Sequence, residues 1–226
     1  MAENHHFFSK ILSVFSSILS FCLVLSAIGC AGLAVNPAPT ISNDQVGEAF
    51  TAVPSPTAFL PTSPENQIVI ACSQPGIVRR FELHSAAMNE ILPFSVYYPP
   101  CYGNGVQDVY PALYLLHGQT FDDTQWQRLG ITLLADHLIQ TGRTLPFLII
   151  MPYEQFHYRP VKNNQFPVAL LDELLPWVES NLHAKSERYW RAIGGISRGA
   201  SWAVRLGLQH WDLFGAIGAH LSLIHI

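Results

Sequence analysis

A serine that could act as a nucleophile lies at the centre of the string Gly195-Ile196-Ser197-Arg198-Gly199. The string matches the G-x-S-x-G pattern, in which a serine occupies a sharp turn between a strand and a helix. An apolar run precedes the string and a helix-type segment begins at residue 200, as the pattern requires. Gly195 and Gly199 would relieve crowding at such a turn. Ser197 is therefore the candidate nucleophile, and the alternative is an ordinary strand-to-helix connection.

Two backbone amides are candidates for stabilising negative charge beside this serine. The amide of Arg198 follows the serine at the N-terminus of the predicted helix, where N–H groups point out of the helix. The second candidate follows a His117-Gly118 pair that ends a predicted buried strand, and it is the amide of Gln119. We expect His117 itself to bond to backbone rather than to act as a base, because it follows its strand directly in a fixed turn. The pattern predicts nucleophilic acyl chemistry.

Strand-type and helix-type segments that could position these residues alternate from about residue 67 onward. Two alternating segments predict a hairpin, and continuous apolar runs predict strands covered on both faces. Together they predict an α/β layered fold. The expected strands are 78–84, 92–98, 110–116, 147–151, 189–196 and 214–220, and the expected helices are 129–140, 168–182 with a kink or division at Pro176, and 200–209.

The chain resembles the esterase family that includes esterase D, feruloyl esterase modules and enterochelin-type esterases. The resemblance covers about 78–220 and rests on the segments FSVYYPPCYGN, YPALYLLHGQTFDDTQW, LPFLIIMPY, LLDELLPWVESNL and RAIGGISRGASWAVRLGLQHWDLFGAIGAH. It implies an α/β-hydrolase-type sandwich with a mostly parallel central sheet and an N-terminal antiparallel hairpin. It also implies that Ser197 is the nucleophile and that the amides of Arg198 and Gln119 form the oxyanion hole.

The resemblance further implies that the fold is incomplete at the C-terminus. The family's acid and histidine follow the strand that corresponds to 214–220, so we expect 67–220 to be a partial domain that is inactive by itself. None of His210, His220 and His225 is expected to serve as the base, because none has a following segment to position it. Residues 221–226 read LSLIHI, which CTGTCTCTTATACACATC encodes. That DNA is a transposase end sequence used in preparing libraries, so we expect a non-native tail.

The first thirty residues have the features of an export signal. No charge occurs from Ile11 to Gly29, a length that could enter a bilayer. The ending Ala27-Ile28-Gly29-Cys30 is similar to a bacterial lipobox, so we expect a signal peptide over 1–30 and acylation of Cys30. Plain cleavage and an uncleaved anchor are the alternatives. Residues 31–66 are rich in Pro, Ser and Thr and predict a disordered linker between a lipid-anchored N-terminus and an extracytoplasmic domain.

Two cysteines remain in the predicted domain, Cys72 and Cys101. In an oxidising compartment they could form one disulfide that closes a loop around the predicted hairpin. The alternative is two buried, unpaired thiols.

Composition narrows the classes of partner. Charged residues make up 12% of the chain and the formal net charge is −4, so no basic surface that follows phosphates is expected and nucleic acid is excluded as a partner. No Cys/His metal spacing and no phosphate loop occurs, so we expect neither metal nor cofactor. Asp122-Asp123 could hold a metal, but adjacent acids in a turn more often cap a helix.

A polar group follows the predicted strand 147–151 at its carboxyl end, the rim where open α/β sheets bind ligands. It consists of Tyr153, Glu154, His157 and Tyr158, which either line a pocket or form a solvated loop.

The leading hypothesis is hydrolysis of a small-molecule or glycan-linked ester through an acyl-enzyme on Ser197. The alternatives are acyl transfer to a sugar hydroxyl in the same fold and a non-catalytic, surface-binding lipoprotein.

Overall fold

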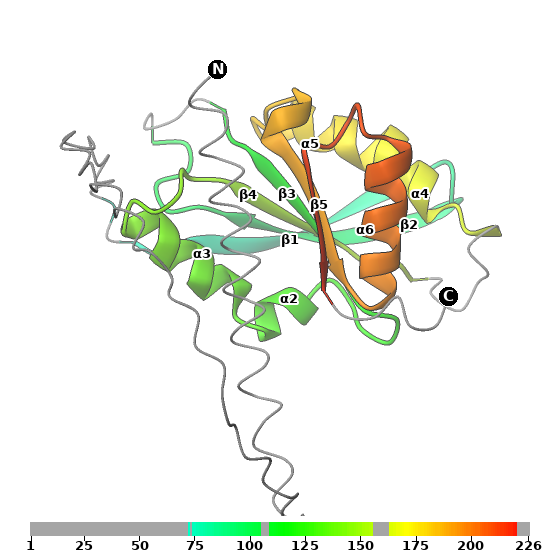
Figure 1. Ribbon diagram of the computed structural model, residues 1–226, viewed down its shortest axis with the longest axis horizontal. Coiled ribbons are helices and arrows are strands. Elements are labelled where there is room, and N and C mark those ends of the chain that lie inside the picture. Colours follow the sequence, from blue (N-terminus) through cyan, green and yellow to red (C-terminus); the bar gives the residue numbers. More distant parts are fainter. Residues whose placement is uncertain (1–71, 73, 105–108, 156–162, 221–226) are drawn as a thin grey trace, which may run out of the picture.

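The computed structural model describes residues 72, 74–104, 109–155 and 163–220, and the fold is given for these residues. It contains a six-stranded sheet in the order β1-β2-β4-β3-β5-β6, seen through the middle of the molecule in Figure 1. The strands are β1 (Ile77–Ser85), β2 (Glu90–Tyr98), β3 (Ala112–Leu116), β4 (Leu148–Pro152), β5 (Arg191–Ile196) and β6 (Ala216–His220).

The strand directions divide the sheet into two parts. β1 and β2 form an antiparallel hairpin, and β2 also pairs antiparallel with β4. The remaining pairs, β4 with β3, β3 with β5, and β5 with β6, are parallel. The prediction of a mostly parallel sheet with an N-terminal antiparallel hairpin is therefore confirmed.

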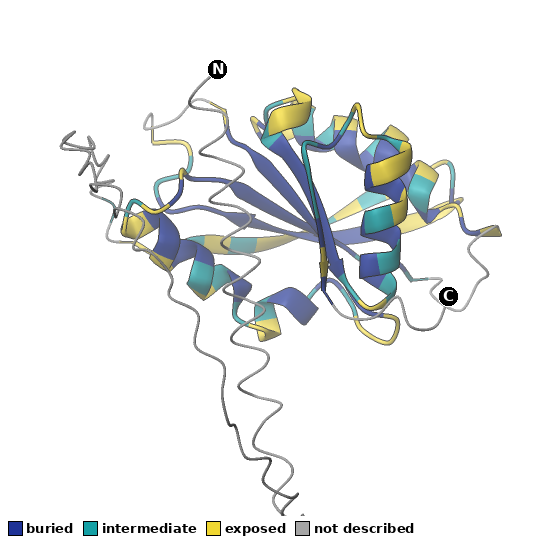
Figure 2. Ribbon diagram, viewed as in Figure 1, coloured by how far each residue is buried: buried dark blue, intermediate teal, exposed yellow. Residues whose placement is uncertain are grey.

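Helices cover both faces of the sheet, as Figure 1 shows. One face carries α2 (Gln125–Arg128) and α3 (Ile131–Gln140), and the other carries α4 (Phe166–Val168), α5 (Leu175–Asn181) and α6 (Arg198–Gln209). Successive side chains of a strand point to opposite faces, so β3 supplies Tyr114 and Leu116 to one apolar core and Leu113 and Leu115 to the other. Both cores are buried, and the central strands are buried along their length (Figure 2).

Two predicted helices are present, with differences in where they begin and how they are divided. The predicted helix 129–140 is α3 alone, and α2 precedes it beyond Gly130, whose φ of 82° is in the region that glycine favours. The predicted helix 168–182 is divided into three parts. Between α4 and α5 lies a π-helical segment, Ala169–Leu174, and Pro176 follows it in the first turn of α5. A proline lacks the N–H that would continue the α-helical pattern, which fits the change of hydrogen bonding next to it.

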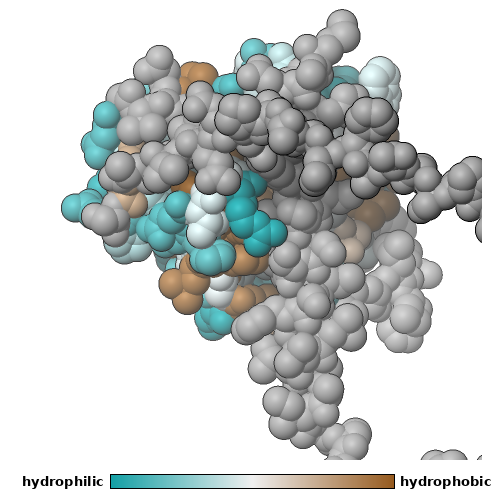
Figure 3. Space-filling model, turned by 60° about the vertical axis from the view of Figure 1, so that its left-hand side comes forward, coloured by the Kyte–Doolittle hydropathy of each residue, from teal (hydrophilic) through white to brown (hydrophobic). Residues whose placement is uncertain are grey.

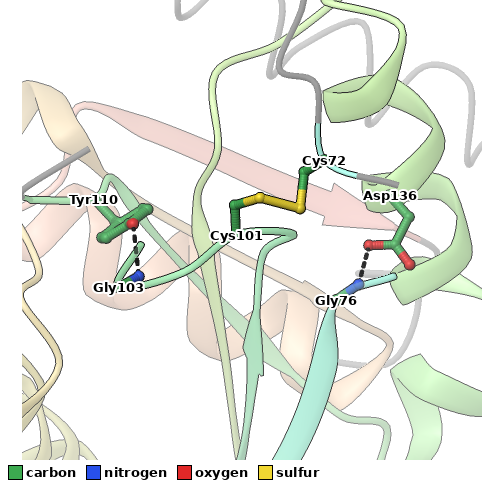
Figure 4. Close-up of a disulfide and its surroundings, with 6 residues drawn as sticks. All are labelled: Cys72, Gly76, Cys101, Gly103, Tyr110 and Asp136. Atoms are coloured by element: carbon green, nitrogen blue, oxygen red, sulfur yellow. Dashed lines mark hydrogen bonds between the residues drawn. A yellow bond between two sulfur atoms is a disulfide. The ribbon is translucent and has the colours of Figure 1, made fainter. Parts of the chain in front are cut away.

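The start of the described domain is attached by a disulfide to the turn that follows β2. Cys72 and Cys101 are bonded, with their Cα atoms 6.0 Å apart (Figure 4). Close by, the amide of Gly76 donates to the Asp136 carboxylate at 2.9 Å, and Asp136 also accepts from the hydroxyl of Tyr97. The bond closes a loop that contains the β1–β2 hairpin, so the hairpin is covalently tied at its open end.

The described part of the chain contains no long apolar helix. Among residues 72–220, with the gaps given above, none of the helices has the length and hydrophobicity to cross a bilayer. The predicted signal peptide, Cys30, the linker 31–66 and the tail 221–226 lie outside the described residues. On the face in Figure 3, the described hydrophobic side chains occur in small groups between hydrophilic ones.

Candidate active site

Ser197 lies between the end of β5 and the start of α6, in a backbone conformation that is rare for a residue with a side chain. Its φ is 53° and its ψ is −116°, and the residue is exposed. A positive φ at a residue other than glycine carries steric strain, which a structure retains where surrounding contacts impose it. The amide of Ser197 donates to the carbonyl of His220 at 3.0 Å, and its carbonyl accepts from the amide of Ser201. The turn therefore presents the serine side chain at the carboxyl edge of the sheet.

Glycines are required on both sides of this serine. A Cβ at Gly195 would lie 2.2 Å from the backbone of Gly199, and a Cβ at Gly199 would lie 2.3 Å from the carbonyl oxygen of Leu116. Backbone atoms cannot give way as the end of a flexible side chain can. The close approach of β5, α6 and β3 thus accounts for both glycines of the G-x-S-x-G string.

The strand register brings the two candidate oxyanion amides to one edge of the sheet. β3 and β5 are neighbouring parallel strands in which Leu116 is opposite Gly195. Gln119 follows Leu116 by three residues and Ser197 follows Gly195 by two, so both lie just beyond the same carboxyl edge. Gln119 is exposed, and among the described residues no hydrogen-bond partner is found for its amide. Arg198 begins α6, directly after the serine.

The loop that carries Gln119 is fixed by bonds on both sides of Gly118. The amide of Gly118 donates to Oε1 of the buried Gln125 at 2.7 Å, and its carbonyl accepts from the amide of Phe121. Nδ1 of His117 lies 2.7 Å from the same carbonyl. These hydrogen bonds therefore fix the loop, in addition to its attachment to the end of β3.

His117 is a buried residue whose two ring nitrogens face backbone groups. The amide of Glu154 donates to Nε2 at 2.8 Å, so Nε2 is the accepting nitrogen and Nδ1 carries the proton that is donated to Gly118. The side chain is 3% exposed. This arrangement agrees with the expectation of a backbone-bonding residue and leaves neither nitrogen to act as a base.

Glu154 is more deeply embedded in the site than its sequence position predicts. The sequence predicts a pocket wall or a solvated loop there, but Glu154 is 3% exposed and its carboxylate accepts two hydrogen bonds from the guanidinium of Arg198, at 2.6 and 2.9 Å. The available signal was an acid two residues after a buried strand, together with an arginine beside the serine. Tyr153, its neighbour, is half-buried with its ring centroid 5.4 Å from that of His117. His157 and Tyr158 lie outside the described residues.

Asp122 makes contacts within its own turn, whereas Asp123 contacts the β1–β2 hairpin. Oδ1 of Asp122 accepts from the amide and the hydroxyl of Thr124, as a residue in a helix-leading turn does. Burial acts to raise the pKa of Asp122, but these bonds and the nearby Arg128 bring that pKa below its ordinary value. Asp123 accepts from Ser95 and Arg80. Within the described ranges, no group of three His, Cys, Asp or Glu residues could hold a metal ion.

Among the described residues, none of the histidines that follow Ser197 forms a hydrogen bond with its hydroxyl. His210 follows the last residue of α6, about 18 Å of helix from the serine. His220 is 7% exposed, and its Nε2 has no partner among the described atoms. It contacts the serine turn through its carbonyl. His225 lies outside the described residues.

Comparison with known proteins gives a consistent assignment. The family model described as "Putative esterase" matches residues 85–224. The chain is 30% identical over 153 residues to an endo-1,4-beta-xylanase/feruloyl esterase of Xylanibacter ruminicola, covering 63% of this chain and 21% of that protein. It is 28% identical over 120 residues to the esterase Rv1288 of Mycobacterium tuberculosis, covering 49% of this chain and 25% of that protein. The chain thus spans a quarter or less of these relatives.

Solved structures show the same fold. A ferulic acid esterase matches with a TM-score of 0.58 and 26% identity, over 62% of this chain and 57% of that one. A ferulic acid esterase from Anaeromyces mucronatus, in complex with ferulic acid, matches with a TM-score of 0.56 and 20% identity, over 65% and 58% of the two chains. At that identity the second match supports the fold alone.

Proposed function

Because the chain belongs to the esterase family whose model it matches, we propose that it is the nucleophile-bearing part of a serine carboxylic-ester hydrolase. The observation that carries the proposal is the positive φ of Ser197 between two glycines that tolerate no Cβ, beside a His-Gly loop on the neighbouring strand. Strain of this kind is found where a backbone presents a reacting group. A plain strand-to-helix connection needs no such conformation.

In the proposed reaction, the hydroxyl oxygen of Ser197 attacks the carbonyl carbon of an ester. The carbonyl π bond breaks and the oxygen becomes an anion, to which the amides of Arg198 and Gln119 donate hydrogen bonds. Collapse of this intermediate expels the alcohol and leaves an acyl-enzyme. Water then attacks the acyl-enzyme and releases the carboxylic acid, which restores the serine.

The serine proton needs a base, and we propose that neither His117 nor His210 supplies it. The ring nitrogens of His117 face backbone groups, and His210 is at the far end of α6. The family order of serine, then acid, then histidine would supply both partners after β6. We therefore propose that this chain does not turn over esters by itself. The substrate would be a small-molecule or glycan-linked ester. Relatives that are named feruloyl esterase and ferulic acid esterase support an ester as the substrate.

Hydrolysis of 4-nitrophenyl acetate and of methyl ferulate, by this chain and by the complete gene product, tests the proposal. The complete protein is expected to hydrolyse at least one ester, to be labelled by a fluorophosphonate, and to lose both properties on Ser197→Ala. A labelled Ser197→Ala protein would overturn the assignment of the nucleophile. Turnover by this chain equal to that of the complete protein would contradict the proposal that this chain does not hydrolyse esters by itself.

We also propose that the domain works outside the cytoplasm, attached to the membrane through an acylated Cys30. The Cys72–Cys101 disulfide supports an oxidising compartment, because such bonds are rare in the reducing cytosol. Expression in a bacterium with labelled palmitate is expected to mark the wild type and to leave a Cys30→Ser variant unmarked. A wild type without label, recovered in the soluble fraction, would contradict the anchor.

A further inference from the structure

One buried carboxylate connects the segments that follow β3, β4 and β5 at the carboxyl edge of the sheet. The proposed mechanism does not use it. Glu154 follows β4 by two residues, and its side chain is 4% exposed. A buried charge is costly unless hydrogen bonds and an opposite charge compensate for it. The hydrogen bonds and the ion pair that Glu154 makes therefore indicate the role of an acid at this position.

The carboxylate is bonded on both oxygens, and most of its donors come from the first turns of α6. Oε1 accepts from Arg198 at 2.6 Å and from Nδ2 of Asn164 at 2.5 Å. Oε2 accepts from Nε of Arg198 at 2.9 Å and from Nε1 of Trp202 at 2.9 Å. Two parallel bonds from one guanidinium fix the orientation of both groups, which a single bond would not.

The backbone of the same residue holds the other side of the site. The amide of Glu154 donates to Nε2 of His117, whose Nδ1 donates to the carbonyl of Gly118, next to Gln119. Through its side chain Glu154 thus reaches the residue that supplies one candidate oxyanion amide. Through its backbone it reaches the loop that supplies the other.

We propose that Glu154 is a positioning residue that holds the amides of Arg198 and Gln119 at the spacing needed to stabilise the oxyanion, an inference that rests on the proposed esterase function. Donors aimed in advance at a developing charge stabilise the transition state without reorganising, so their value depends on their placement. Displacement of a site by about 1 Å can reduce a rate about 100-fold. The two hydrogen bonds between Glu154 and Arg198 restrain Arg198, the residue whose backbone amide would donate to the oxyanion.

The experiment uses the complete gene product and the variant Glu154→Gln. Glutamine has nearly the same shape, but its NH₂ group would face an N–H donor of Arg198, Trp202 or Asn164. We expect kcat to fall by about 10- to 100-fold while KM stays within about threefold, because the lost interaction acts in the transition state. The rate of fluorophosphonate labelling of Ser197 is expected to fall in parallel, since that reaction also places negative charge in the site.

The matched control is Asp136→Asn. Asp136 is a second buried carboxylate, 8% exposed, which accepts from Gly76 and Tyr97 on the opposite face of the sheet. Its loss is expected to lower the melting temperature with kcat unchanged. If Asp136→Asn and Glu154→Gln lower kcat equally, Glu154 serves only the stability of the fold and the proposal is wrong.

Two further variants keep the outcome decisive. If Glu154→Gln does not fold, Arg198→Lys replaces it, because lysine keeps the charge and the backbone amide but cannot make the two-point contact; kcat is expected to fall by about fivefold or more, again without a change in KM. Wild-type kcat in whichever variant folds overturns the proposal. Ser197→Ala is measured beside them. Turnover that survives Ser197→Ala contradicts the proposed role of Ser197 as the nucleophile, whereas loss of turnover in Ser197→Ala combined with an unaffected Glu154→Gln contradicts only the role of Glu154.

Discussion

The amide of Ser197 donates a hydrogen bond to the carbonyl oxygen of His220, with 3.0 Å between nitrogen and oxygen. The two residues lie at the carboxyl ends of neighbouring parallel strands, where Ile196 is opposite His220. On the other side, Gly199 packs against the end of β3. The strained turn is therefore held from both neighbouring strands, which explains how a positive φ at a serine can persist.

Replacing Gly199 by alanine should destabilise the domain. The new methyl group would lie 2.3 Å from the carbonyl oxygen of Leu116, so β3 and α6 would have to separate. We expect a loss of about 2 kcal/mol in the free energy of unfolding, measured by urea denaturation. Gly118→Ala is the control, because its nearest neighbour would be 3.5 Å away. Equal losses in the two variants would show that the close approach at Gly199 is unimportant.

Breaking the ion pair between the buried Arg191 and the half-buried Glu179 should cost more than breaking an exposed one. Arg191 begins β5 with a side chain 3% exposed, and it also donates to the carbonyls of Ser186 and Leu213. Glu179→Gln would leave a buried guanidinium without its counter-charge, at a cost of about 3 kcal/mol.

The exposed pair between Arg128 and Asp122, at 3.5 Å, provides the comparison. Arg128→Gln is expected to change the free energy of unfolding by less than about 1 kcal/mol in the same urea titration. A smaller effect for Glu179→Gln than for Arg128→Gln would refute the ranking.

Removal of the Cys72–Cys101 disulfide should lower stability through the unfolded state. The two residues are 29 apart in sequence, and a loop of that length restrains the unfolded chain by about 3–4 kcal/mol. We expect dithiothreitol to lower the melting temperature of the wild type and to have no effect on the Cys72→Ser, Cys101→Ser double variant. An equal response of both proteins to the reductant would show that the bond contributes nothing.

Stability should decrease in alkali because the half-buried Tyr102 has a raised pKa. Burial, with neighbouring Tyr98 and Tyr110, raises the pKa of Tyr102 to about 12. An unfolded tyrosine ionises near pH 10. Since the folded-state pKa is the higher one, the contribution of Tyr102 is fully present below about pH 10 and is lost as the pH rises toward 12.

The measurement is the free energy of unfolding between pH 9 and pH 12, for the wild type and for Tyr102→Phe. The variant loses the bond from this hydroxyl to the carbonyl of Leu182, so it should be less stable at neutral pH, but its stability should fall less steeply in alkali. Identical slopes for the two proteins would exclude Tyr102 as a source of the alkaline loss.

Local sequence determined much of this fold. Continuous apolar runs predicted β3 and β4 because parallel central strands are covered on both faces, and alternation predicted the β1–β2 hairpin. The Gly-Ile-Ser-Arg-Gly string located a strand, a tight turn and a helix at once, since few residue types fit such a turn. The roles of Ser197, Arg198 and Gln119 in chemistry stay predictions.

The tertiary structure decided what depends on residues distant in sequence. Glu154, Arg198 and Trp202 have no sequence pattern in common, and only the adjacency of the loop after β4 to α6 turns an expected pocket or loop residue into a bonded, buried carboxylate. The sequence left a disulfide between Cys72 and Cys101 as one of two possibilities, and the folded hairpin brings the two sulfurs together. Periodicity reports which face of an element is buried, because that is a property of neighbouring residues in one segment. It cannot report which partner a polar side chain meets, because that partner comes from another segment.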